Sequence, residues 1–182
     1  GGYGGRVHGL LFPYTTDQVS PELLKATKSA AAKLDVGIRM HFAQSENELR
    51  LIADRHGGKT PVEYLDSIGF LGPEVMLTHA LLGRDPDGTM SDGELATLAE
   101  HGITVTNCPW IYSMRGSYLN SISRYLDAGI NVCLGTDTQP DDILREMRFG
   151  AIMGKVAHTD ARTATAREVY NAVTVNAAKF LR

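Results

Sequence analysis

The sequence predicts an α/β fold built on a parallel β-sheet, and two observations lead to this prediction. Along most of the 182 residues, short runs rich in apolar and β-branched side chains alternate with segments of helical spacing. The short runs are apolar nearly throughout, which is typical of parallel strands that are covered on both faces. Strand–helix–strand repetition leaves two architectures open, an open doubly wound sheet and part of a (β/α)8 barrel.

Each predicted strand is followed by a segment of helical spacing. The predicted strands are Arg6–Phe12, Gly37–Phe42, Val75–His79, Ile103–Asn107 and Ile130–Gly135. One further helix is expected near Thr165–Leu181, after the last strand–helix unit. The chain contains no internal linker, so these elements are expected to form a single domain.

Capping signals mark where the predicted helices begin and end. Ser20 followed by Pro21 predicts a helix that runs through Leu34, because proline is favoured at the first helical position. Ser/Thr-x-x-Glu patterns predict capping boxes for Ser45 with Glu48, Thr60 with Glu63, Ser91 with Glu94, and Thr165 with Glu168. Left-handed caps at helix ends are predicted for Gly57, Gly69, Gly102 and Gly129.

Composition narrows the class of protein. The 18 basic and 21 acidic side chains leave a net charge of −3, which argues against nucleic acid and membrane surfaces as partners. Cys108 and Cys133 make neither a disulfide framework nor a CxxC motif. The sequence has no signal peptide and no apolar run near the roughly 20 residues of a membrane span. We therefore expect a cytoplasmic protein with one domain over residues 6–182, preceded by a linker or junction at residues 1–5.

Three titratable side chains stand near the carboxyl ends of predicted strands, where chemistry gathers in either architecture. His41 lies at the end of the second strand, His79 ends the third, and Asp137 follows the fifth. Two imidazoles and a carboxylate that converge from a rigid scaffold suit a divalent metal or acid–base chemistry. A histidine at a strand end is commonly structural, and an aspartate after Gly-Thr commonly caps a helix, so a purely structural rim is the alternative.

Other residues near the strand ends have less specific interpretations. Cys108 is predicted to be a packing cysteine, with a nucleophile as the alternative. Several large side chains are predicted to lie in loops, where they either pack or line a pocket for a flat ring: Phe12, Tyr14, Trp110, Tyr112 and Met114. The remaining histidines are expected to be ordinary, with His8 inside the first strand, His56 and His101 in last helical turns, and His158 before a loop.

An ordered set of motifs carries a resemblance to a known family. The matching stretches are Met40-His41-Phe42-Ala43-Gln44-Ser45, His79 in Val75-Met76-Leu77-Thr78-His79-Ala80, Asn107-Cys108-Pro109, Ala128-Gly129 before Ile130–Leu134 with Gly135-Thr136-Asp137, and the closing segment from Thr165 to Lys179. In these stretches, which span the chain from about Arg6 onward, the protein resembles the carboxyl-terminal half of the amidohydrolase superfamily, in its branch of deaminases and s-triazine hydrolases. The resemblance implies that the five strands are strands 4–8 of a (β/α)8 TIM barrel.

The resemblance also implies a function and a site. It implies a metal-dependent hydrolase that uses metal-activated water on non-peptide C–N or C–Cl bonds of a small, ring-containing substrate. Carried over by motif, His41 and Asp137 would ligate one divalent ion, with Zn²⁺ favoured and Fe²⁺ or Mn²⁺ open. Asp137 would also take a proton from the attacking water, and His79 would polarise the substrate.

Two departures from the family pattern open an alternative. The family's His-x-His ligand pair is not in this sequence, which leaves fewer protein ligands than a catalytic metal site needs. Position 44 is glutamine where the family's deaminases have a glutamate that shuttles a proton, so Gln44 would orient the substrate by hydrogen bonds. The alternative function is a catalytically weakened or non-catalytic barrel module.

The length of the chain bears on what completes the fold. A (β/α)8 barrel takes roughly 250 residues, so five units cannot close one. We expect Gly1–Gly5 to mark a truncation, a chain break or a tag junction. An amino-terminal half-barrel with the other ligands is then expected from the same polypeptide or from a partner chain, and the formation of a homo-oligomer stays open. A half-barrel is expected to leave two sheet edges and an apolar interior unpaired.

Overall fold

The computed structural model describes residues 4, 7–117, 119 and 122–181. Within these ranges the chain forms one parallel five-stranded sheet in the order β1-β2-β3-β4-β5. The strands are β1 (Leu10–Leu11), β2 (Gly37–Phe42), β3 (Val75–His79), β4 (Thr104–Asn107) and β5 (Asn131–Leu134). Because each strand pairs with its successor in the sequence, the sheet has the strand order of a (β/α)8 barrel and lacks the switch point of a doubly wound sheet.

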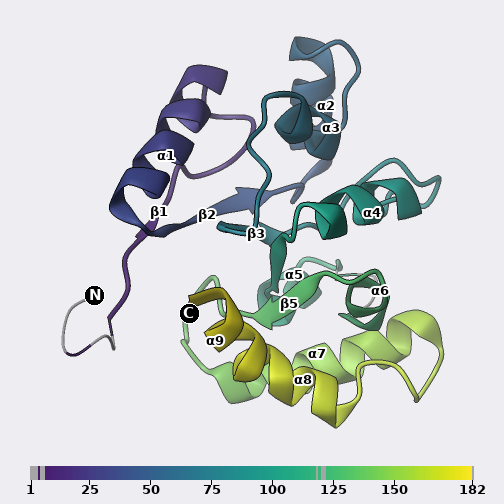
Figure 1. The fold of residues 1–182 in the computed structure, drawn as a ribbon. Helices are drawn as coiled ribbons and strands as arrows, with labels where there is room; N and C mark the ends of the chain where they lie inside the picture. The colour runs from purple at the N-terminus through teal and green to yellow at the C-terminus, as the bar shows by residue number, and fades with distance from the viewer. Residues whose placement is uncertain (1–3, 5–6, 118, 120–121, 182) are drawn as a thin grey trace.

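Helices connect the strands and continue after the last one. They are α1 (Pro21–Leu34), α2 (Glu46–Arg55), α3 (Pro61–Ser67), α4 (Asp92–Glu100), α5 (Pro109–Met114), α6 (Ile122–Asp127), α7 (Ile143–His158), α8 (Ala166–Val173) and α9 (Val175–Leu181). Figure 1 shows them in an arc around the strands, from α1 through α4 to α7 and α8. None of the helices in the described ranges is both long and apolar enough to cross a membrane.

The interior strands agree closely with the sequence, whereas the first strand does not. The bounds of β2, β3 and α1 are those predicted. Strands β4 and β5 each begin one residue later than predicted, and β5 also ends one residue earlier. The prediction of a strand over Arg6–Phe12 was wrong, because β1 covers two residues and His8 precedes it. Beyond Leu11, Pro13 supplies no N–H and Tyr14 has a left-handed backbone (φ 78°), so ladder pairing stops there.

The predicted helix ends are confirmed with two exceptions. Complete capping boxes form at Thr60, Ser91 and Thr165, and all four predicted glycine caps have positive φ. At the remaining predicted box, Ser45 caps α2, but the carboxylate of Glu48 bonds elsewhere. The predicted last helix, Thr165–Leu181, is two helices separated by Thr174, where three consecutive β-branched residues (173–175) disfavour a continuous helix.

The two faces of the sheet have different chemistry. On the outer face, Met40, Leu77, Val105 and Val132 are register partners in adjacent strands, and each is fully buried beneath the helices. Burial of side chains of this size contributes about 1.5–3 kcal/mol each, so this row forms the centre of the core. The outer face therefore explains the apolar character of the predicted strands.

The inner face of the sheet carries polar as well as apolar side chains, so the expectation of an apolar interior holds only in part. Arg39 pairs in register with Met76, and His41 with Thr78, which in turn pairs with Thr106. These side chains alternate with the buried outer row, as the pleat of a strand requires. The polar side chains of the inner face lie on the same strands that carry the candidate site at their carboxyl ends.

The edge of the sheet at β5 is partly covered, which corrects the expectation that both edges are unpaired. The side-chain amide of Asn176 in α9 donates to the backbone oxygen of Val132 at 2.8 Å. In return, the side chain of Asn131 donates to the backbone oxygen of Asn176 at 3.0 Å. The first of these hydrogen bonds satisfies a backbone carbonyl of β5 that would otherwise be free to pair with another strand, and the second holds α9 in place.

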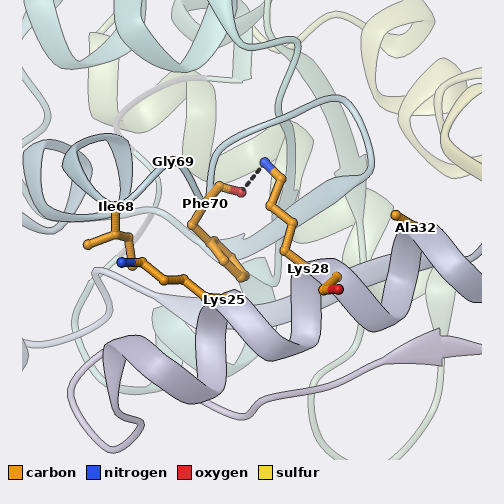
Figure 2. Close-up of a pocket in the computed structure, with 7 residues that line it drawn as sticks. Lys25, Lys28, Ala32, Ile68, Gly69 and Phe70 are labelled. Atoms are coloured by element: carbon orange, nitrogen blue, oxygen red, sulfur yellow. Dashed lines mark hydrogen bonds between the residues drawn. The ribbon is translucent and has the colours of Figure 1, made fainter.

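Outside the sheet, Lys28 fixes α1 to the loop before β3. Its ammonium group donates to the backbone oxygens of Phe70 and Leu71 and lies 3.3 Å from the carboxylate of Glu74. Figure 2 shows Lys28 reaching Phe70 across the hollow between α1 and this loop, a cavity of about 270 Å³. Because the donors of Lys28 are engaged by the loop, we interpret this hollow as structural.

Two glycines of α7 provide a paired test of how closely this helix packs against its neighbours. A Cβ at Gly154 would lie 2.6 Å from the Cβ of Ala164, whereas a Cβ at Gly150 would meet its neighbours at 3.6–3.7 Å. Gly154→Ala should therefore lower the free energy of unfolding by about 1 kcal/mol or more through overpacking. Gly150→Ala should raise it by about 0.5–1 kcal/mol, because alanine favours the helix. Urea unfolding of both variants measures the difference, and equal effects would contradict the packing described for α7.

Candidate active site at the carboxyl ends of the strands

Three of the four predicted site residues, His41, His79 and Asp137, converge from three strand ends. The Nδ1 atom of His41 lies 2.9 Å from Nε2 of His79. The carboxylate of Asp137 lies 3.9 Å from each of these nitrogens, through Oδ1 to His41 and Oδ2 to His79. Their side chains are 14%, 1% and 19% exposed for His41, His79 and Asp137 respectively. The sequence therefore located these residues at the rim, and the structure brings them into one cluster.

Strand alternation alone would keep the two histidines apart. His41 pairs in register with Thr78, so His79 pairs with Phe42, which belongs to the outer, buried row. In a regular strand the His79 side chain would consequently point toward the helices. Instead its backbone turns to φ 86°, and the imidazole reaches the inner side where it meets His41. This turn at the strand end makes the cluster possible.

Left-handed backbone is concentrated at this rim. Tyr14, Ala43, His79, Ala80 and Asp137 all have φ between 48° and 86°, and each lies at or just beyond the carboxyl end of a strand. Such conformations cost about 1–3 kcal/mol each outside glycine and persist where surrounding contacts hold them. The rim therefore carries backbone strain where the candidate site lies, a pattern typical of functional sites.

The electrostatic environment keeps both imidazoles neutral. Burial, together with the neighbouring charges of His41, Arg115 and Arg39, lowers the pKa of His79 to about 3. Burial also lowers the pKa of His41, although the Asp137 carboxylate acts in the opposite direction. Neutral imidazole carries a free nitrogen lone pair, which is the form that binds a metal. One of the two facing nitrogens carries the hydrogen of their contact.

The donor set fits a divalent cation. Within the described residues, His41, His79 and Asp137 form a group whose ligand atoms all lie within 4.8 Å of one another. Two ligand atoms that share a metal at about 2.0–2.2 Å lie at most about 4.4 Å apart. The pair of His41 with His79 meets that limit, and so does Asp137 with each histidine, through a different carboxylate oxygen in each case. The Nδ1 atom of His79 is buried and has no hydrogen-bond partner among the described residues. Imidazole nitrogen and carboxylate oxygen are the ligands that zinc accepts.

Gln44 is held beside the cluster by Tyr112. The hydroxyl of Tyr112 donates to Oε1 of Gln44 at 3.1 Å, and the tyrosine ring lies 4.7 Å from the His79 ring between centroids. Burial raises the pKa of Tyr112, so its hydroxyl keeps the proton that it donates. With Oε1 accepting from tyrosine, the amide nitrogen of Gln44 is free among the described residues to donate to a bound molecule.

The large side chains near the rim divide into two groups. Phe12 and Tyr14 lie in the loop after β1, as predicted, with their rings at 5.3 and 5.6 Å from the His41 ring. The prediction that Trp110, Tyr112 and Met114 lie in a loop was wrong, because all three belong to α5. Pro109 occupies the start of this short helix, a position that proline favours.

Sequence reasoning missed the place of Arg39. Its guanidinium lies 4.8 Å from the centre of the Phe12 ring, and its buried Nε atom has no hydrogen-bond partner among the described residues. Together with Thr78, Thr106 and Asp137 it lines a cavity of about 350 Å³ on the inner face, next to the histidines. An arginine inside an otherwise apolar strand was the signal that could have identified it.

The other histidines lie away from the cluster. His56 stacks on Tyr64 with ring centroids 3.9 Å apart, and Nε2 of His101 lies 2.9 Å from the carboxylate of Asp66. His56 and His101 are the capping residues at the ends of α2 and α4, as predicted. His158 is the last residue of α7, at the boundary where the helix was expected to end.

Comparison with known proteins finds relatives along nearly the whole chain. The sequence profile of the amidohydrolase family matches residues 3–182. A 5'-deoxyadenosine deaminase of Methanothermobacter thermautotrophicus is 33% identical over 180 residues, which are 97% of this chain and 40% of that protein. A 5-methylthioadenosine/S-adenosylhomocysteine deaminase of Thermococcus kodakarensis is 34% identical over 181 residues, or 97% of this chain and 41% of the relative. The chain thus spans about two fifths of the length of these relatives.

Solved structures give the same picture of the fold. An adenosine deaminase from Xanthomonas campestris with bound zinc superposes with a TM-score of 0.82 at 22% identity, over 93% of this chain and 38% of that one. A variant of atrazine chlorohydrolase from Arthrobacter aurescens, complexed with zinc and atraton, superposes with a TM-score of 0.80 at 25% identity, over 94% and 37% of the two chains. The predicted fold class, part of a (β/α)8 barrel, is confirmed.

The two cysteines provide a test of the packing interpretation. Cys108 and Cys133 are buried, and burial raises the pKa of both thiols, that of Cys133 to about 12. Because the thiolate is the reactive form, neither cysteine should react with a maleimide at pH 8 in the folded protein, and both should react in urea. Peptide mass mapping identifies the labelled residue. Rapid labelling of Cys108 in the folded protein would instead support the nucleophile interpretation.

Proposed function

The chain belongs to the amidohydrolase family, and on this premise we propose that it supplies part of the active site of a metal-dependent hydrolase. The proposed enzyme acts on C–N or C–Cl bonds of a small, ring-containing molecule. The observation that carries the proposal is the convergence of His41, His79 and Asp137 from three strand ends within hydrogen-bonding and ion-pairing distances. The zinc-containing structures with the same fold support the same chemistry.

In this proposal, His41 and Asp137 hold one divalent ion. The Nδ1 atom of His41 and Oδ1 of Asp137 lie 3.9 Å apart, and both side chains are partly accessible from the rim. When bound, such an ion lowers the pKa of water from about 15.7 to about 7 and so provides a nucleophile at neutral pH. Zinc is the ion that the related structures favour, and Fe²⁺ or Mn²⁺ fits the same donor types. We propose that the remaining ligands belong to another part of the whole protein, which corresponds to the portion of the relatives that this chain does not span.

The residues around the ion would divide the remaining work. The second oxygen of the Asp137 carboxylate, Oδ2, lies on the His79 side. This oxygen can accept the proton of the attacking water. His79 is buried and stays neutral at pH 7, because its pKa lies far below that value. A neutral imidazole in that position donates a hydrogen bond to the substrate as negative charge develops. Phe12 and Tyr14 would form an aromatic wall for a flat ring beside His41.

Gln44 limits the reactions that fit. A carboxamide donates hydrogen bonds but has no titratable proton, so it cannot protonate a ring nitrogen or a departing amine. The pair of Tyr112 and Gln44 would hold a substrate acceptor atom in place. Such a site suits a leaving group that needs no proton from residue 44 when it departs, for example chloride. The same residue is the observation that favours the second candidate, a catalytically weakened module that binds ring-containing molecules.

Replacing the carboxylate of Asp137 tests the proposal. In the whole protein, meaning this chain with the rest of its reading frame, Asp137→Asn should lower kcat by about 10³-fold or more, because an amide neither accepts the proton nor holds the ion well. Chelation by dipicolinic acid should abolish turnover, and added zinc should restore it. Turnover is measured with 5'-deoxyadenosine, S-adenosylhomocysteine and atrazine, which represent the relatives' reactions.

The matched control is Asp54→Asn on the exposed surface of α2, where the carboxylate pairs with Arg50. This variant should retain its metal and its turnover. The proposal would be contradicted if the whole protein turned over one of these substrates and kcat were unchanged both after chelation and in Asp137→Asn. Binding of these compounds without turnover would favour the non-catalytic module.

The Tyr112–Gln44 pair gives a second test. Tyr112→Phe removes the hydroxyl that holds the Gln44 amide while keeping the ring against His79. We expect kcat/KM to fall by about three- to tenfold, as loss of one hydrogen bond predicts. Tyr64→Phe is the control. Tyr64 is a buried residue of α3, and its hydroxyl has no hydrogen-bond partner among the described residues. Equal kcat/KM in the two variants would show that the pair does not orient the substrate.

A further inference from the structure

The carboxylate of Glu48 makes unusual hydrogen bonds for its position. Ser45 caps α2 and Glu48 is the third helical residue, so the sequence predicts that Glu48 bonds the backbone amide of Ser45. In the structure, Oε1 of Glu48 instead accepts from the backbone N–H of Ala43 at 2.9 Å, and Oε2 accepts from that of Gln44 at 2.9 Å. Glu48 is 1% exposed. Both oxygens of a buried carboxylate are therefore committed to the loop after β2.

The other predicted capping boxes show what the same position does elsewhere. Glu63, Glu94 and Glu168 are the third residues of α3, α4 and α8, and each accepts the amide of its own N-cap residue, at 2.9, 2.9 and 2.6 Å. Glu94 is also buried, at 6% exposed. The carboxylate of Glu48 is thus used differently from three glutamates in equivalent helical positions, and the difference occurs next to the candidate site.

The amide that Glu48 holds belongs to a peptide that joins two strand ends. Ala43 is fully buried and has a left-handed backbone (φ 48°). Its carbonyl accepts from the backbone N–H groups of Leu81 and Leu82, in the loop after β3, at 3.1 and 3.0 Å. Ala43 follows His41 by two residues, and Leu81 follows His79 by two. The carbonyl of Ala43 and the N–H of Gln44 belong to one peptide group, so the Glu48–Gln44 bond holds the peptide that bridges the two histidine-bearing loops.

Burial and hydrogen bonding act on Glu48 in opposite directions. Burial raises its pKa, and the backbone amides of Gln44 and Ala43 lower it. A buried carboxylate of this kind is destabilising unless hydrogen bonds satisfy it, and here both backbone donors come from the strained loop. The carboxylate and the left-handed backbone are thus mutually dependent.

We propose that Glu48 is a positioning residue of the candidate site: by holding the amides of Ala43 and Gln44, it fixes the bridge that sets His41 against His79 and orients Gln44. Glu48 itself does not touch the three clustered side chains. The effect of Glu48 on metal binding rests on the function proposed above. Its effect on the hydrogen bonds between Ala43 and the loop after β3 does not.

The test compares Glu48→Gln with Glu168→Ala in the whole protein, because the carboxylate of Glu168 bonds Thr165 and Ser123 and neither histidine-bearing loop. Both oxygens of Glu48 accept a backbone N–H, so the NH₂ group of a glutamine must lose one of these bonds, whereas Glu168→Ala removes the capping carboxylate of α8. Two readouts are used: amide hydrogen exchange of Leu81 and Leu82 by mass spectrometry, and binding of Co²⁺ with its visible absorption spectrum. Urea unfolding reports the loss of stability in each variant, so that general destabilisation is separated from a local effect.

We expect Glu48→Gln to speed exchange of the Leu81 and Leu82 amides at least tenfold, to weaken Co²⁺ binding at least tenfold and to shift the Co²⁺ spectrum. Glu168→Ala should lose stability through the missing cap of α8, with neither change. Unchanged exchange at these amides in Glu48→Gln would overturn the proposal, whether or not Co²⁺ binds. A wild-type protein that binds no Co²⁺, with the exchange difference intact, would contradict the proposed function and leave the positioning role supported.

If Glu48→Gln does not fold, Glu48→Asp replaces it. Aspartate keeps the charge and both oxygens but shortens the reach, so the same two effects should appear in weaker form. Folded Glu48→Asp with wild-type exchange at Leu81 and Leu82 and wild-type Co²⁺ affinity would overturn the proposal.

Discussion

The contact between His41 and His79 depends on the left-handed backbone at the end of β3. Parallel pairing in register places these residues on opposite faces of the sheet, because His41 lies beside Thr78. The turn at His79 and Ala80 reverses the direction of the imidazole and brings Nε2 to 2.9 Å from the Nδ1 atom of His41. The cluster with Asp137 therefore requires a conformation that a regular strand would not adopt, held by hydrogen bonds from the adjacent loop.

The sheet supports this arrangement by separating two environments. Its outer face carries a fully buried apolar row that fixes the strands against the helices. Its inner face carries Arg39, Thr78 and Thr106 beside the cluster and the cavity that they line. The same strands therefore supply stability on one side and polar chemistry on the other, which matches the division of labour in (β/α)8 enzymes.

Sequence patterns predicted the elements that depend on local signals. The bounds of β2, β3 and α1 follow from apolar runs and from Ser20-Pro21, and the glycine caps follow from the need for positive φ. The site residues at strand ends were also predicted, because the carboxyl ends of parallel strands lie on one rim. These predictions needed no knowledge of which residues meet across the sheet.

The remaining features depend on contacts between distant segments. The break at Thr174 places Asn176 where it covers the edge of β5, and the hydrogen bond of Gln44 to Tyr112 joins residues far apart in the sequence. Likewise, Ser45-x-x-Glu48 has the pattern of a capping box, yet the carboxylate bonds Ala43 and Gln44 because those amides lie nearer in the folded loop. A local pattern cannot distinguish between donors that tertiary structure brings together.

The central claim, that His41 and Asp137 together hold a metal ion, is tested most directly by anomalous diffraction. Crystals of the whole protein grown with zinc are measured on both sides of the zinc absorption edge. The account predicts an anomalous peak within bonding distance, about 2.0–2.2 Å, of the Nδ1 atom of His41 and of the Asp137 carboxylate. A zinc peak elsewhere, or full-length crystals with zinc in solution and no peak between these two side chains, would contradict it.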